Sequence, residues 1–175
     1  MSFPQLSAND RENILRNNWW GHDGRWYLFV SKEFGFEKAN EMNMAINKAV
    51  GKLEMKNYMD VSKIDEEYIK RDLVQNLKLN LELCAQDVFT IMDFYDEDNH
   101  FILKISRCAA HFGTQKADYM RNYKCACFKR IEGWFDAIGV NATVLIQKSL
   151  VNDDKFCEII IRPDTEKFKE TLRKC

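Results

Sequence analysis

The first half of the chain carries apolar side chains at the spacing of one helical face. The clearest series is Ala39, Met42, Ile46, Ala49 and Leu53, which predicts a helix there. Three further segments show helical spacing, over about 7–20, 22–34 and 64–81. A turn is expected at 60–65, and the alternation of leucines from 77 to 83 leaves the end of the last helix open.

Local signals set the expected ends of these helices. Ser7 is a candidate N-cap with Asp10 as its capping-box partner. Gly21 is expected to break the first helix, and Gly35 to end the second as a left-handed cap. Gly51 lies inside the third helix at a cost of about 1 kcal/mol relative to alanine, which predicts a close crossing with another helix.

From residue 87 the apolar period changes to two, which is typical of strands. The predicted strands cover four segments, at 88–95, 101–105, 142–151 and 156–162. A polar turn at 96–99 joins the first two into a hairpin, and Pro163 ends the last. Two helices are expected between the strand pairs, at 116–121 and from Cys125 to Ile138, where Gly139 follows. Residues 165–174 read as a polar terminal helix.

A helical half followed by strands indicates an α+β fold with an antiparallel sheet. The expected order after the N-terminal helices is β-β-α-α-β-β. Neither the helical half at 1–83 nor the α+β half at 84–175 has enough apolar faces to bury its apolar side chains without the other half. We therefore expect a single domain over 1–175.

Composition excludes several classes of function. The chain has 175 residues and a net charge of −1, so it lacks the basic stripe that nucleic-acid partners favour, and it has no polybasic patch for a membrane. It contains no Walker loop, dinucleotide fingerprint, Gly-x-Ser-x-Gly or His-Glu-x-x-His. The N-terminus has no signal-peptide pattern and no apolar run could span a bilayer, so a cytoplasmic location is expected, where cysteines stay free or bind metal.

Candidate chemistry lies in the C-terminal half, at Cys108, His111, Cys125, Cys127 and Cys157. Thiolate and imidazole groups bind soft metals, and a convergent Cys3His set would suit zinc or iron. The alternative is that the cysteines are buried small apolar residues and that His111 is a hydrogen-bonded, partly buried histidine.

The Cys125-Ala-Cys127 segment stands at a predicted helix start, where the helix dipole lowers thiol pKa values. Metal ligation and a reactive thiolate are both open for this pair, with Cys125, Cys127 and His111 as candidate catalytic groups. Cys84 and Cys175 have no recognisable partner and receive no role.

A second candidate site is aromatic. Trp19, His22 and Trp26 lie near one helical face, and Asn43 belongs to a polar column on the third helix. Aromatic walls with few polar groups are typical of small-molecule sites, so these four residues are candidate ligand-binding residues. A capped helix start and a solvated polar face are the alternatives.

Two stretches, Asn17–Tyr27 and Phe34–Asn43, together with Tyr123–Phe135, resemble an uncharacterised family of cytosolic proteins of anaerobic bacteria and archaea. More distantly, the C-terminal half is similar to 4-vinyl-reductase-type domains and to aminothiazoline-carboxylate hydrolase-like proteins. The first resemblance implies a small-molecule-binding module that in some members holds a structural zinc. Cys125 or Cys127 and Cys157 match two of its ligand positions, and Ser149 stands at the third.

Three hypotheses follow. The first is a small-molecule-binding domain with a cysteine-lined site that binds zinc or iron or faces the ligand. The second is a cysteine-dependent hydrolase of a small amide-like or thiazoline substrate, with His111 or His22 as base. The third is a structural protein without catalysis that forms a homodimer through its terminal helix or an edge strand.

Overall fold

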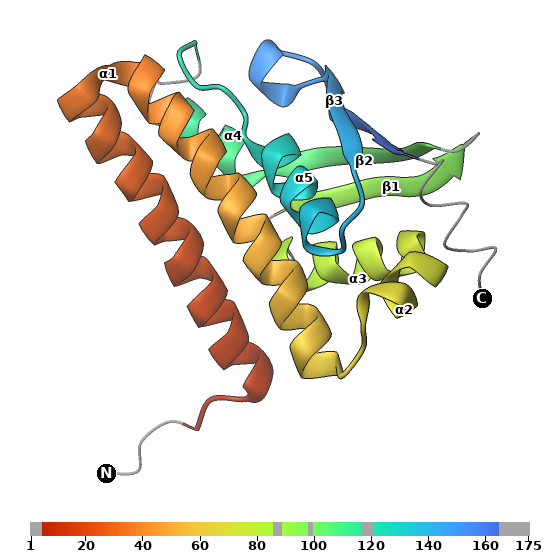
Figure 1. Ribbon diagram of the computed structural model, residues 1–175. Helices are drawn as coiled ribbons and strands as arrows, with labels where there is room; N and C mark the ends of the chain where they lie inside the picture. Colours follow the sequence, from red (N-terminus) through yellow and green to blue (C-terminus); the bar gives the residue numbers. More distant parts are fainter. Residues whose placement is uncertain (1–4, 86–88, 98–99, 117–120, 165–175) are drawn as a thin grey trace.

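A computed structural model describes residues 5–85, 89–97, 100–116 and 121–164. The protein is α+β, as predicted: a long N-terminal helix is followed by an antiparallel sheet with interspersed helices (Figure 1). The predicted terminal helix at 165–174 lies outside the described residues.

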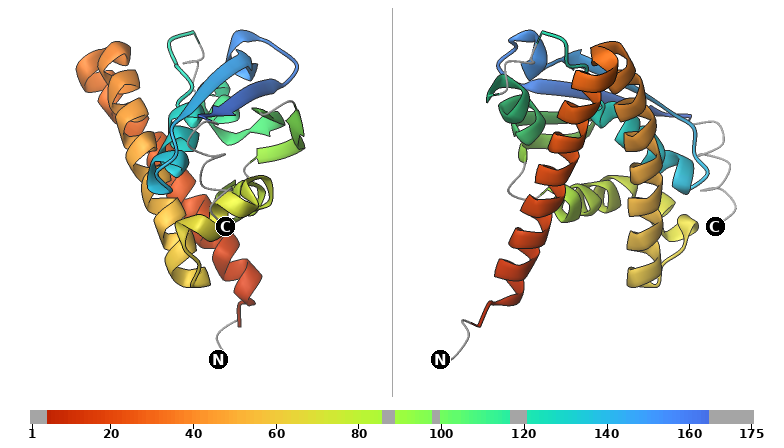
Figure 2. Two further views of the ribbon diagram at one scale, coloured as in Figure 1. Left: turned by 45° about the vertical axis from the view of Figure 1, so that its right-hand side comes forward. Right: turned by 90° about the vertical axis from the view of Figure 1, so that its left-hand side faces the viewer.

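Helix α1 (Ala8–Ser62) consists of two arms joined at a kink. Gly35 has φ 80° and ψ 163°, a conformation that is essentially restricted to glycine, so the chain turns sharply there. We call residues 8–34 the N-terminal arm and residues 36–62 the C-terminal arm. The arms diverge from the kink (Figure 2). Although α1 spans 55 residues, neither it nor another helix of the described ranges could cross a membrane.

The sequence signals for α1 were right at Ser7 and wrong at Gly21. At Gly35 the break is confirmed, but the ψ of 163° differs from that of the predicted left-handed cap. Ser7 and Asp10 form the predicted capping box, with the Asp10 N–H donating to Ser7 Oγ at 3.1 Å. Gly21 lies within the uninterrupted N-terminal arm. A glycine inside a helix costs about 1 kcal/mol relative to alanine, which is less than the other turns of the helix contribute to its stability. A single helical glycine therefore does not end the helix.

Two short helices follow α1. Helix α2 (Glu66–Arg71) has Asp65 as its N-cap, whose side chain accepts from the Tyr68 N–H, and α3 (Leu73–Ala85) follows. The turn between α1 and α2 is shorter than the predicted 60–65, because α1 continues to Ser62 and Lys63 adopts the left-handed cap.

The sheet has strand order β1-β2-β4-β3, and all neighbouring strands are antiparallel. Its strands are β1 (Phe89–Glu97), β2 (His100–Cys108), β3 (Ala142–Lys148) and β4 (Cys157–Pro163). A 3-10 turn, Leu150–Asn152, connects β3 to β4. On β4, Ile159 pairs with Leu103 of β2 on one side and with Ile146 of β3 on the other.

Helices α4 (Ala109–Lys116) and α5 (Cys127–Ala137) lie between β2 and β3 in the described part of the chain. Helix α4 starts directly after Cys108. The predicted helix at 116–121 lies largely outside the described residues, which include only Lys116 at the end of α4 and Arg121 in a turn. Helix α5 (Cys127–Ala137) lies where a helix was predicted, and Gly139 adopts φ 65° after it.

The core lies between the sheet and the helices. Helix α5 contributes Trp134 and Phe135, and the sheet contributes Leu103, Ile159 and Ile161, all nearly or fully buried. The C-terminal arm of α1 packs on α5, and both are seen beside the sheet in Figure 1. The alternating strand pattern therefore points one face of β2 and β4 at α5.

The predicted close helix crossing exists, and two glycines make it possible. A Cβ atom on Gly51 would overlap the Arg130 carbonyl group of α5, and a Cβ atom on Gly133 would overlap the Lys48 carbonyl group of α1. Backbone therefore meets backbone at this crossing. The contact fixes α5, and with it the cysteines at its start, against the C-terminal arm.

Candidate functional site

A cavity of about 400 Å³ lies between the N-terminal arm of α1, the sheet and α5. Its walls are predominantly apolar, and its size is within the range of small-molecule sites. Apolar side chains from five elements face it: Leu28 of α1, Leu81 of α3, Leu103 and Ile105 of β2, Ile131 and Trp134 of α5, and Ile159 of β4.

Three of the five predicted cysteine and histidine ligands line this cavity. Cys108 comes from the end of β2, Cys125 from the segment before α5, and Cys127 from the first position of α5. Among the residues described as lining the cavity, neither His111 nor Cys157 is present. The predicted cluster of five residues is thus not brought together as a whole. The thiols of Cys108, Cys125 and Cys127 face the same apolar cavity.

Cys125 and Cys127 form a sulfur–sulfur contact. Their Sγ atoms are 3.1 Å apart, and each side chain is partly buried. Either sulfur can be the donor in this contact; when Cys125 is the thiolate, the Cys127 thiol and the Cys127 backbone N–H both donate to it, which lowers the pKa of Cys125. Sharing that hydrogen bond, together with burial, raises the pKa of Cys127 well above its usual range. Cys125 is therefore the first of the two to become a thiolate.

Cys108 has a different environment. Burial raises its pKa to about 12, although the backbone N–H groups of His111 and Ala110 at the start of α4 partly oppose this. Cys157 is buried at the start of β4, where its sulfur accepts from the Leu150 N–H at 3.4 Å, and burial also raises its pKa. Both thiols stay protonated at neutral pH.

The described residues contain no group of three or more His, Cys, Asp or Glu side chains placed to hold a metal ion. The zinc or iron site predicted from Cys108, His111, Cys125, Cys127 and Cys157 thus receives no geometric support and stays a prediction. Nothing is described for the side chain of Cys84, and Cys175 lies outside the described residues.

Of the four predicted ligand-binding residues, Asn43 is described as lining the cavity, and neighbours of the other three on the N-terminal arm line it in their place. Trp20, Asp23 and Tyr27 line the cavity, together with Asn43 of the C-terminal arm. Trp19, His22 and Trp26 are not among the described cavity-lining residues, and His22 is exposed. The lining residues lie one position further along the chain, a rotation of about 100° on a helix of 3.6 residues per turn.

Asn40 holds the segment that carries Cys125. Its Oδ1 atom accepts from the Tyr27 hydroxyl and from the Lys124 backbone N–H, each at 2.9 Å. Its Nδ2 atom donates to the Asn122 carbonyl group at 2.7 Å. One buried side chain therefore joins the two arms of α1 to the chain that enters α5. Asn40 belongs to the same polar column of the sequence as Asn43, a pattern that does not by itself indicate this role.

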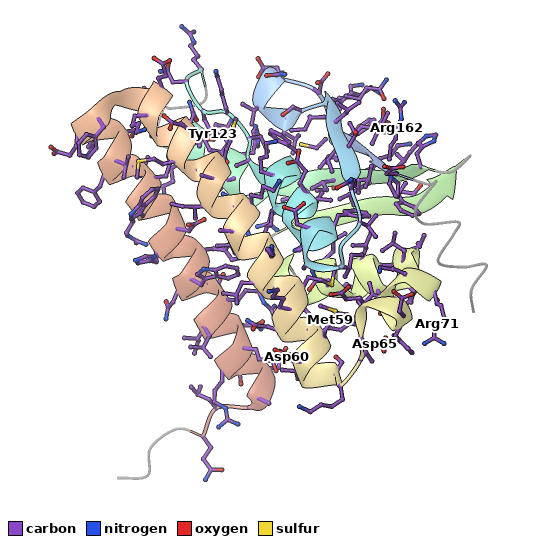
Figure 3. All side chains as sticks on the ribbon, in the orientation of Figure 1. Met59, Asp60, Asp65, Arg71, Tyr123 and Arg162 are labelled. Atoms are coloured by element: carbon purple, nitrogen blue, oxygen red, sulfur yellow. The ribbon has the colours of Figure 1, made fainter. Side chains whose placement is uncertain are left out.

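Two tyrosines pack beside this network. The Tyr27 and Tyr123 rings meet edge to face, with centroids 5.3 Å apart. Burial raises the pKa of Tyr27 to about 12 and raises that of Tyr123 well above its usual range. Figure 3 places Tyr123 near the kinked end of the C-terminal arm, at the opposite end from Met59 and Asp60.

Arg130 forms the polar part of the wall contributed by α5. Its guanidinium group donates to both carboxylate oxygens of Glu54, and Trp134 Nε1 donates to the same carboxylate at 3.0 Å. The guanidinium carbon also lies 4.8 Å and 5.0 Å from the ring centroids of Trp19 and Trp20. The ion pair between Arg130 and Glu54 neutralises the buried charges. The contact of Arg130 with the two tryptophan rings attaches the N-terminal arm to α5.

Together, fold and cavity define an α+β protein that encloses a thiol-lined apolar space. The chain belongs to DUF6125, a family of unknown function, whose model matches residues 5–152. No curated protein matches its sequence. No named relative supports the similarity to 4-vinyl-reductase-type domains or to hydrolases.

A solved structure shares the fold. It is a trafficking protein particle complex subunit 3 from Naegleria fowleri, covalently bound to palmitic acid, with a TM-score of 0.65 and 10% sequence identity. The match covers 87% of this chain and 96% of that one. At this identity the similarity establishes the fold alone.

Proposed function

We propose that this protein is a small-molecule-binding domain whose ligand is largely apolar and occupies the cavity beside Cys108, Cys125 and Cys127. The observation that carries the proposal is the cavity itself. It measures about 400 Å³, has mainly apolar walls and lies between elements distant in sequence. Burying apolar ligand surface there contributes about 25 cal/mol per Å² removed from water.

The fold relative supports an elongated hydrocarbon as one ligand class. That protein is described as covalently bound to palmitic acid. In this chain Tyr27, Asn43, Asn47 and Asp23 supply polar groups at the cavity wall, so a ligand with one polar end and an apolar body suits it.

The two other hypotheses have less support. A cysteine hydrolase needs a base near its nucleophile, and no histidine is among the described cavity-lining residues. Metal binding by Cys108 and the Cys125–Cys127 pair stays a prediction that elemental analysis of the purified protein tests. Homodimer formation also stays a prediction, which light scattering tests.

Ligand binding is tested by thermal unfolding with palmitic acid and with an uncharged polarity-sensitive dye. A ligand at 100 times its Kd stabilises the folded protein by about 2.7 kcal/mol, so the melting temperature should rise with concentration. Dye fluorescence should increase and palmitic acid should displace the dye.

A cavity-filling variant assigns the binding to this site. Ala110 of α4 lines the cavity, so Ala110→Phe should fill part of it and weaken both ligands at least tenfold. Gln115→Phe adds the same ring at an exposed position of the same helix and should bind like the wild type. Absence of binding by both probes, or equal binding by both variants, would show that the proposal is wrong.

A further inference from the structure

The Cys125–Cys127 pair has a geometry that ligand binding alone does not require. The two sulfur atoms are in contact at 3.1 Å, and the intervening Ala126 is only 1% exposed, which holds the segment in place. A disulfide bond would need the sulfurs to approach by about 1 Å more. We propose that Cys125 and Cys127 form a thiol–disulfide exchange site, which accepts small uncharged organic disulfides from the cavity and becomes an intramolecular disulfide.

The two cysteines have unequal roles. Cys125 attacks, since the Cys127 backbone N–H at the start of α5 donates to its sulfur and the Cys127 thiol, 3.1 Å away, can donate to its thiolate. Cys127 keeps its proton and acts second. Cys108 lines the same cavity and does not compete as a nucleophile, because burial keeps it a thiol.

The exchange balances without another oxidant. The Cys125 thiolate attacks one sulfur of the small disulfide RSSR, so that a Cys125–SR bond forms, the RS–SR bond breaks and one RS⁻ leaves. The Cys127 thiol then gives its proton to this RS⁻ and attacks the Cys125 sulfur. This step forms the Cys125–Cys127 bond and releases the second RS⁻. The second RS⁻ takes up the proton that Cys125 released to water when it became a thiolate. The dithiol thus loses two electrons, and the small disulfide is reduced to two thiols.

The cavity defines the substrate class. Its walls are mainly apolar, and the guanidinium group of Arg130 at its edge is already paired with Glu54. An uncharged, carbon-rich disulfide gains from burial there, while a polyanionic one loses hydration without a charged partner. The dithiol site does not depend on which ligand the cavity otherwise binds.

The test uses the neutral probe 4,4′-dithiodipyridine on the full chain at neutral pH. The wild type should release two thiopyridone molecules for each pair, and peptide mapping should find a bond between Cys125 and Cys127. Cys127→Ser should release one thiopyridone from this site, one fewer than the wild type, and keep a pyridylthio group on Cys125. Cys125→Ser should react at Cys127 on the order of tenfold more slowly than Cys127→Ser does at Cys125.

Two further measurements complete the test. Cys157→Ser removes a buried thiol outside the described cavity wall and should leave the exchange unchanged. Limited alkylation of the wild type should label Cys125 before Cys127, which keeps the test independent of whether the variants fold. Stable pyridylthio groups on both cysteines without a bond between them, or equal rates in the two variants, would overturn the proposal. So would alkylation of Cys127 first.

Discussion

At the scale of single residues, Asn40 controls the position of the thiols. Its amide makes three hydrogen bonds that connect Tyr27, Asn122 and Lys124, and it is 4% exposed. Removing a buried amide with these partners lowers the free energy of unfolding by more than the lost hydrogen bonds alone, because several polar groups are left unsatisfied.

Asn40→Ala should therefore lower the free energy of unfolding by about 1–3 kcal/mol, measured by urea denaturation. It should also change the alkylation rate of Cys125, since the segment after Asn122 loses its attachment. Asn47→Ala is the matched control, because Asn47 bonds only to Asn43 on its own helix in the contacts described, and it should change neither quantity by more than about 0.5 kcal/mol or twofold. Equal losses in both variants would contradict this role of Asn40.

Cys108 should make the protein less stable at alkaline pH. Its pKa is about 12 in the folded protein, compared with a usual value of 9.0, because the thiolate is poorly solvated. Above pH 9 the unfolded thiol loses its proton while the folded thiol keeps it. This stabilising contribution is complete below pH 9 and declines as the pH rises toward 12, by up to about 1.4 kcal/mol per pH unit.

Cys108→Ala should remove the part of this slope that Cys108 contributes, while Cys127 and Cys157, whose pKa values are also raised, contribute equally in both proteins. Urea unfolding between pH 7 and 10 should give a wild-type free energy that falls more steeply above pH 9 than that of the variant. Below about pH 10 the comparison is free of Tyr27, whose pKa is raised from 10.0 to about 12. Parallel curves for the two proteins would contradict the burial effect assigned to Cys108.

At the scale of elements, the crossing of α1 and α5 depends on the absence of two side chains. Gly51→Ala and Gly133→Ala each place a methyl group against a carbonyl of the facing helix, so the helices must separate. Overpacking of this kind costs about 1–3 kcal/mol. Gly24→Ala is the control, because a Cβ atom there meets nothing within 4 Å, and the higher helix propensity of alanine should stabilise the protein by up to about 1 kcal/mol. Thermal unfolding distinguishes the three, and the interpretation is wrong if Gly51→Ala is as stable as Gly24→Ala.

The elements that the sequence predicted are those with strong local signals. The capping box at Ser7, the break at Gly35, the close approach at Gly51 and α5 all depend on neighbouring residues or on one face. Helix α4 could not be predicted in the same way, because Cys108 and Ala109 continue directly from a strand without a common N-cap residue.

The candidate site was predicted in part for the same reason. Cys125 and Cys127 could be paired from sequence because they are two residues apart and precede a helix. The packing of β2, β4 and α5 determines which other predicted residues line the cavity. It places Cys108 there, and His111 and Cys157 are not among the described lining residues. The cavity face of the N-terminal arm depends on where it meets α5 through Arg130, which no local pattern specifies.

At the scale of the whole molecule, the kink at Gly35 determines whether there is a cavity. It reverses the direction of α1 (Figures 1 and 2). Trp20, Asp23 and Tyr27 of the N-terminal arm therefore line a space whose other walls come from the sheet and α5. A straight helix of 55 residues would leave those walls open to solvent. The enclosure therefore depends on one backbone conformation that only glycine adopts easily.

Gly35→Ala should consequently affect binding as well as stability. The positive φ of 80° with an extended ψ costs an alanine about 1–3 kcal/mol, although space for the methyl group is available. The strain is relieved if the N-terminal arm moves off the cavity, so palmitic acid and the dye should bind more weakly and amides of the N-terminal arm should exchange hydrogen faster.

Phe34→Ala is the neighbouring control, because Phe34 is 70% exposed and its removal should leave probe binding and amide exchange in the N-terminal arm unchanged. If Gly35→Ala lowers the melting temperature but leaves probe affinity and amide exchange in the arm at wild-type values, the kink affects stability alone. Faster exchange confined to the N-terminal arm, together with weaker binding, would instead mean that the arm is the movable wall through which ligands reach Cys125 and Cys127. The C-terminal arm should stay protected in that case, since the crossing at Gly51 and Gly133 holds it against α5 independently of the kink.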